Sequence, residues 1–197
     1  PAAIRVSMIE LQTLIAMHPT VERLSLRGSA FKRLALLAAR RGESGRTALA
    51  RHVGEMTESY TQAVALAREE GGPPHFYPRM QSACGLLLGH LLAGRNPQEP
   101  ALASALLDAC QALLAADASQ PDFWSTVGQG EWELYRSLAL HHLHAPYSDI
   151  AAMWAFAHER EPGVREWGSV RDTVEIVARV ARIAPGLPKS GSFCSKP

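Results

Sequence analysis

The feature that most constrains the fold is an apolar stripe at helical spacing in residues 18–37, which read HPTVERLSLRGSAFKRLALL. Thr20 can cap the amino end of this helix, and Glu22 adds a negative charge that the helix dipole favours. Small and apolar residues share one face: Leu24, Gly28, Phe31, Ala35 and Ala38. A glycine there costs about 1 kcal/mol against alanine, so we expect Gly28 to permit close approach of a partner helix.

Helical spacing recurs along the 197-residue chain, whose Ala- and Leu-rich stretches are separated by Gly and Pro clusters. We find no convincing strand pattern, and therefore predict an all-α domain over residues 1–184, followed by a flexible tail over residues 185–197. The predicted helices are 4–17, 21–39, 46–70, 78–93, 99–116, 131–143, 148–160 and 164–183. A short helical turn at Phe123 and Trp124 would precede a break at Gly128 and Gly130.

Two successive pairs of these helices, 21–39 with 46–70 and 78–93 with 99–116, resemble tandem helical hairpins of the tetratricopeptide class. The repeats are degenerate, because the second helix of the first pair carries its signature residues later than the standard spacing. We expect about eight helices that form a short right-handed solenoid. The chain begins at Pro1 and enters a helical pattern almost at once, so we expect a piece of a longer polypeptide.

Four blocks of sequence resemble the tetratricopeptide-like TRAFs-binding domain, known from the central regulatory region of apoptosis signal-regulating kinases and from many bacterial multidomain proteins. The blocks are HPTVERLSLRGSAFKRLA at 18–35, YTQAVALA at 60–67, DFWSTVGQGEWELYRSLA at 122–139 and REWGSVRDTVEIV at 165–177. The chain differs from the family pattern at Arg27, Thr173 and Ile176. The resemblance implies a helical scaffold without catalysis, often beside a protease-like, kinase or signalling domain.

This pattern favours a non-enzymatic interaction module, without a cofactor, that binds a protein segment or a neighbouring domain of its parent chain. If the helix over residues 21–39 lines a concave face, as first helices do in tetratricopeptide arrays, Ser29, Lys32 and Arg33 project into the groove. Gln81 is their expected counterpart from the helix over 78–93. The first hairpin is also rich in basic residues, and an acidic partner peptide would suit them.

Two further function classes stay open. A metal-dependent hydrolase could use His141 and His144, which share a helical face, although zinc needs three or four ligands and no HExxH motif is present. An RNA-binding module could use the arginines of the first hairpin, although the net charge of +1 provides no global basic field. The sequence holds no P-loop, Rossmann fingerprint or Gly-x-Ser-x-Gly elbow.

The three cysteines indicate a reducing compartment, because they cannot all pair. Cys84 and Cys110 lie in apolar helical patterns typical of buried cysteine, while Cys194 is expected to be exposed in the tail. We found no apolar run of the ~20 residues that a bilayer requires, and no amino-terminal signal. We therefore expect a soluble, cytoplasmic protein, and the sequence leaves its oligomeric state open.

Overall fold

A computed structural model describes residues 2–71, 75–119, 122–140, 147–158 and 163–185. This part of the chain consists of helices and their connections and holds no strand, which confirms the predicted all-α class. The α-helices are α1 (Ala2–Met17), α2 (Val21–Ala39), α3 (Arg46–Glu69), α4 (Phe76–Ala93), α5 (Pro100–Ser119), α6 (Phe123–Ala139), α7 (Tyr147–His158) and α8 (Val164–Ile183), and the 3-10 helix η1 (Gly42–Gly45) joins α2 to α3. The predicted tail lies outside these residues from 186 onward.

Local signals fix several helix ends. The Thr20 side chain accepts a hydrogen bond from the Arg23 amide at 3.1 Å, which confirms the predicted cap of α2. Asp122 and Ser125 form a capping box on α6, in which the Ser125 amide donates to Asp122 at 2.7 Å. Helix α4 ends at Gly94, whose φ of 63° is the left-handed conformation that glycine adopts readily.

The break predicted at Gly128 and Gly130 is wrong, because α6 runs through both glycines. Their missing side chains serve close packing instead. A Cβ on Gly128 would lie 2.9 Å from Cδ1 of Leu113 in α5, and one on Gly130 would lie 2.5 Å from Nε1 of Trp154 in α7. The two glycines therefore let α6 approach both neighbouring helices.

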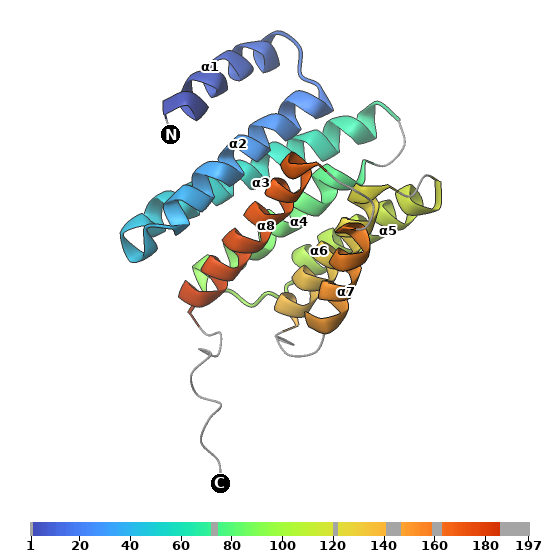
Figure 1. Ribbon diagram of the computed structural model, residues 1–197. Helices are drawn as coiled ribbons and strands as arrows, with labels where there is room; N and C mark the ends of the chain where they lie inside the picture. The colour runs from blue at the N-terminus through green and yellow to red at the C-terminus, as the bar shows by residue number, and fades with distance from the viewer. Residues whose placement is uncertain (1, 72–74, 120–121, 141–146, 159–162, 186–197) are drawn as a thin grey trace.

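Consecutive helices pack against one another from α1 to α7, as expected of a hairpin array (Figure 1). Helix α4 also contacts α6, and α8 returns to pack across α2 and α4. In an open solenoid each repeat contacts only its neighbours, so this return adds a long-range contact. The right-handed solenoid geometry stays a prediction.

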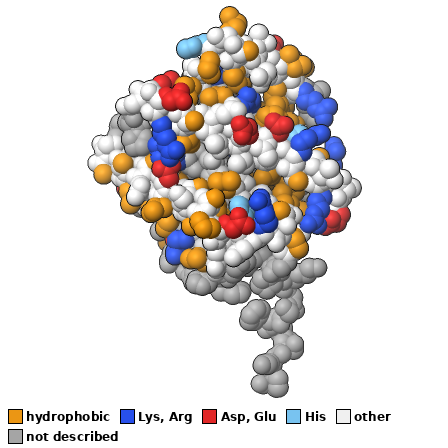
Figure 2. Space-filling view, turned by 180° about the vertical axis from the view of Figure 1, so that it is seen from behind, with side chains coloured by type: hydrophobic (Ala, Val, Ile, Leu, Met, Phe, Trp, Pro, Cys, Tyr) orange, Lys and Arg blue, Asp and Glu red, His pale blue; other side chains and the backbone are white. Residues whose placement is uncertain are grey.

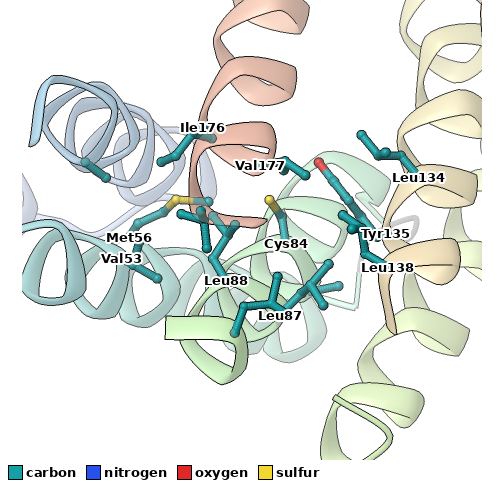
Figure 3. Close-up of a cluster of buried hydrophobic side chains, with 14 of the residues drawn as sticks. Val53, Met56, Cys84, Leu87, Leu88, Leu134, Tyr135, Leu138, Ile176 and Val177 are labelled. Atoms are coloured by element: carbon teal, nitrogen blue, oxygen red, sulfur yellow. The ribbon is translucent and has the colours of Figure 1, made fainter. Parts of the chain in front are cut away.

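The main core joins buried residues of α2, α3, α4, α5, α6 and α8, and Figure 3 shows its central part. Figure 3 shows Cys84, Leu87 and Leu88 of α4 between Val53 and Met56 of α3 and Leu134, Tyr135 and Leu138 of α6, with Ile176 and Val177 reaching in from α8. Cys84 is fully buried, which confirms that it packs as a small apolar residue. The return of α8 is therefore part of the core.

The close contact predicted at Gly28 is confirmed. Gly28 is buried on α2 and faces the ring of Tyr60 on α3, and an added Cβ would lie 2.7 Å from Tyr60 Cε2. Tyr60 is itself fully buried. The absence of a side chain at Gly28 thus provides the space that this ring occupies.

Helix α5 corrects the expectation that every apolar stretch is too short to cross a bilayer. By length and composition alone, this 20-residue helix qualifies as a membrane span, and it is the one described helix that does. One face packs into the array through Leu102, Leu106, Ala109 and Leu113, while Leu107 and Leu114 are exposed. Length and composition do not distinguish a membrane span from a helix that packs within a protein.

Candidate partner-binding groove

The four residues predicted to bind a partner lie in two environments. Ser29 and Arg33, one turn apart on α2, line an open groove beside α1. Lys32 and Gln81 are buried, with 3% and 1% of their surfaces exposed. The expectation that Lys32 projects into an open groove is therefore wrong, because α8 packs across the faces of α2 and α4 that carry Lys32 and Gln81.

Lys32 and Gln81 belong to a buried hydrogen-bonded network that joins four helices. Lys32 Nζ donates to Thr173 Oγ1 of α8 at 3.0 Å and to Gln81 Oε1 of α4 at 3.3 Å. Gln81 Nε2 donates to Glu131 Oε2 of α6 at 3.4 Å. The Thr173 hydroxyl donates to the Ser169 carbonyl oxygen, which leaves a lone pair for Lys32. These side chains connect helices within the protein.

Burial raises the pKa of two acidic groups in and beside this network, Glu131 and Cys84. It raises the pKa of the Glu131 carboxyl, opposed by the positive charge of Lys32. It also raises the pKa of the Cys84 thiol to about 12. A thiolate is the nucleophilic form of cysteine, so Cys84 is unsuited to nucleophilic catalysis at neutral pH.

A second contact fixes α8 to α2 near solvent. The Arg40 guanidinium donates two hydrogen bonds to the Glu175 carboxylate, at 2.9 and 2.6 Å. Arg179 donates to the same carboxylate at 2.7 Å. Hydrogen bonds with these two arginines lower the pKa of Glu175 to about 2. Helix α8 is thus held to α2 by the buried network and by the ion pair of Arg40 with Glu175, while Arg179 binds Glu175 from within α8.

The three positions that differ from the expected family pattern, Arg27, Thr173 and Ile176, all make contacts between helices. Arg27 reaches from α2 to α3, where Nε donates to Ser59 Oγ at 3.0 Å and Nη2 donates to Gln62 Oε1 at 2.5 Å. Thr173 binds Lys32, and Ile176 is fully buried in the core. At Arg27, interhelical hydrogen bonds therefore replace the apolar contact that the repeat pattern predicts.

The open groove has a volume of about 820 Å³ and lies where α1 stands apart from the rest of the array (Figure 1). Its lining is mostly apolar: Ala3, Ile4, Ser7, Met8 and Leu11 of α1, Leu26, Ser29, Ala30 and Arg33 of α2, Phe76 and Tyr77 of α4, Asp122 and Trp124 at the start of α6, and Ser169 of α8. Ligand pockets have volumes of ~300–1,000 Å³ and combine apolar walls with few polar groups. The groove therefore has the size and composition of a binding site.

Three hydroxyl groups meet at one wall of the groove. Ser29 Oγ lies 2.9 Å from the Tyr60 hydroxyl, and the Tyr77 hydroxyl lies 3.3 Å from both. Tyr60 is buried, and burial raises its pKa well above the usual value, so its hydroxyl stays protonated. Ser29 and Tyr77 are partly exposed and line the groove. This hydroxyl triangle is the polar part of an apolar wall.

The wall formed by α1 has a second apolar face. Ile15 and Leu11 pack on α2 and α3, whereas Val6, Ile9 and Met17 point outward with 58%, 71% and 78% of their surfaces exposed. Helix α1 therefore carries exposed apolar side chains on its outward face as well as apolar side chains on the face that lines the groove.

The basic residues of the first hairpin do not form one uniform surface. Arg40 pairs with Glu175 and Arg46 lies 3.6 Å from Glu43, whereas Arg33, Arg41 and Arg51 have no ion pair within the described segments. On the face seen in Figure 2, basic side chains gather mainly along one edge, with acidic and apolar side chains between them. RNA binding stays a prediction, without a continuous basic stripe on that face to support it.

The metal-site alternative falls outside the described residues, because His141 and His144 lie within residues 141–146. Within the segments that the structure does describe, no group of three or more His, Cys, Asp or Glu could hold a metal ion. Cys110 is half-buried, and Cys194 also lies outside the described chain. The described residues thus supply no metal centre for the hydrolase hypothesis, which stays untested.

Comparison with protein-family models, curated proteins and solved structures finds no match for this chain.

The sequence correctly placed Ser29 and Arg33 on the wall of a groove, but it did not predict that Tyr77 and α1 would line the same groove. A signal was present in α1, where apolar residues at 4, 8, 11 and 15 are joined by others at 6, 9 and 17 on a different face. One neighbouring helix cannot bury both faces. Tyr77 had no such signal, because its place beside Ser29 depends on how α4 packs against α2.

Proposed function

We propose that this protein is a non-catalytic interaction module that binds a helical segment of another protein, or of a neighbouring domain, in the groove between α1 and α2. The groove of about 820 Å³, open and mostly apolar, is the observation that supports this function. A regulatory place in a larger signalling or protease-like protein, in the cytoplasm, belongs to the same proposal and rests on the resemblance to the TRAFs-binding domain.

The shape of the groove supports a helical occupant. Two helices form its long walls, and an amphipathic helix binds such a groove through anchors at i, i+3, i+4 and i+7. Leu26 is 49% exposed on one wall, and Ile4 and Met8 of α1 line the other. A third helix would cover the apolar surface that these walls leave open to solvent.

A display library of peptides that covers the proteome of the source organism tests this function. We expect the protein to enrich peptides with apolar residues at helical spacing. Leu26→Glu, which places a charge on the groove wall, should abolish their binding. The matched control is Leu114→Glu, because Leu114 is exposed to a similar degree but lies on α5. Equal binding by both variants, or no enriched peptide at all, would contradict the proposal.

A further inference from the structure

Arg33 is a cation without a partner on the groove wall. Its side chain is exposed, and none of the described residues forms a hydrogen bond or ion pair with its guanidinium. The other charged residue that lines the groove, Asp122, already accepts a hydrogen bond from the Ser125 amide as the cap of α6. The groove therefore presents a guanidinium at Arg33 that no described side chain binds, with the Asp122 carboxylate held in the α6 cap elsewhere on its lining.

Tyr77 presents a hydroxyl donor that its neighbours hold weakly. Its oxygen lies 3.3 Å from both Ser29 and Tyr60, whereas hydroxyl–hydroxyl hydrogen bonds are usually about 2.7–2.8 Å long. Ser29 and Tyr60 form the shorter bond of this triangle, at 2.9 Å. The Tyr77 proton is thus available to an acceptor in the groove at little cost to the fold.

These two donors lie on the same part of the wall. Ser29 and Arg33 are four residues apart on α2, and such residues are neighbours with Cβ atoms about 5–6 Å apart. The Tyr77 hydroxyl adjoins Ser29. A carboxylate has two oxygens and accepts only, so it complements a guanidinium and a phenol hydroxyl that line the same groove.

We propose that the groove selects a helix with one Asp or Glu among its apolar anchors, and that Arg33 and the Tyr77 hydroxyl bind this carboxylate together. The inference rests on the proposed function and adds the chemistry of the partner. Apolar residues of the bound helix exclude water from the contact, which strengthens a charge-assisted hydrogen bond. An amide in place of the acid keeps the shape but loses the charge.

The test compares peptides selected from the same proteome library by the parent protein and by Arg33→Gln and Tyr77→Phe. We expect the parent to select Asp or Glu at one fixed position between the apolar anchors. Replacing that acid by its amide in the tightest peptide should weaken binding about tenfold, as expected for loss of a charge-assisted contact. Arg33→Gln and Tyr77→Phe should each reduce this acid-to-amide ratio while binding the amide peptide as the parent does.

Arg41→Gln is the matched control, because Arg41 is exposed and unpaired in the described chain but does not line the groove. Arg41→Gln should keep the same ratio of acid-peptide to amide-peptide affinity as the parent protein. Parent binders without a fixed acidic position, or an unchanged ratio in Arg33→Gln, would overturn the carboxylate site and leave the helix-binding function standing. Failure of the parent to enrich any helical peptide would instead contradict the function itself.

Discussion

Gly28 lets α2 and α3 approach because Tyr60 occupies the space that a side chain would take. The ring is fully buried, so it has little freedom to move away from a new methyl or isobutyl group. We expect Gly28→Leu to lower the free energy of unfolding by ~1–3 kcal/mol, the usual cost of overpacking. Urea unfolding followed by circular dichroism measures this change.

Gly54 provides the control for that substitution. It lies in the interior of α3, and an added Cβ would have no neighbouring heavy atom within 4 Å. Gly54→Ala should therefore raise stability by up to about 1 kcal/mol through helix propensity. If Gly28→Leu unfolds at the same urea concentration as the parent, the close contact between α2 and α3 is not as described.

Lys32 and Arg33 are adjacent in sequence, but we expect their replacement by alanine to change the free energy of unfolding by different amounts. Lys32 is buried and is the charged partner of a network that reaches Glu131, so Lys32→Ala leaves buried polar groups unpaired. Leaving a buried polar group without its hydrogen-bond partner costs about 1–3 kcal/mol. Arg33→Ala should change stability by less than about 0.5 kcal/mol, because an exposed residue without special contacts contributes little. Chemical denaturation measures the free energy of unfolding of both variants.

Because Lys32 is buried, reversing its charge should change the stability of the fold and cannot serve as a test of partner binding alone. If both side chains were exposed, replacing Lys32 and Arg33 together by Glu would leave the fold intact, because exposed charges contribute little to stability. In the structure, Lys32→Glu places a second carboxyl beside the network of Glu131, so it should unfold the protein at lower urea. Arg33→Glu alone is the variant that tests the groove. Equal stability of Lys32→Ala and Arg33→Ala would contradict the buried network.

At the scale of single elements, α8 should respond to acid through Glu175. Hydrogen bonds with Arg40 and Arg179 lower the pKa of Glu175 from 4.5 to about 2 in the folded protein. A lowered carboxyl pKa stabilises the folded state above the unfolded pKa, and this stabilisation is lost as the pH falls through the folded pKa. Glu175→Gln should therefore reduce the loss of stability between pH 4.5 and pH 2.

Thermal unfolding at several pH values measures this effect, with Glu69→Gln as the control. Glu69 is exposed at the end of α3 and forms no ion pair among the described residues. If Glu175→Gln and Glu69→Gln keep the same acid dependence as the parent, the contact between α2 and α8 does not stabilise the fold.

The helices could be predicted because their ends depend on neighbouring residues in sequence, such as the Thr20 cap and Gly94. The continuity of α6 could not, because a glycine that breaks a helix and one that accommodates a neighbour look alike until Leu113 and Trp154 are placed. Lys32 was placed on the correct helix, but its burial depends on Thr173, 141 residues away. A contact between residues so far apart in sequence produces no local sequence pattern from which the burial of Lys32 could be predicted.

At the scale of the whole molecule, the return of α8 divides the surface of the array into two parts. One part, over Lys32 and Gln81, is covered by α8 within the chain. The other part, beside α1, stays open and holds the groove with Ser29 and Arg33. We therefore propose partner recognition on α1 and the adjoining edge of α2, and a structural role for the buried network.

Amide hydrogen exchange of the full chain, with and without the tightest peptide from the proteome library, tests this placement most directly. Binding in the groove should slow exchange in α1 and in the first half of α4, around Phe76 and Tyr77, and leave α5 unchanged. Free α1 should exchange fast, because it packs mainly on α2 and has few buried residues. Protection confined to α5 or to the α2–α3 turn, with α1 unchanged, would contradict the account.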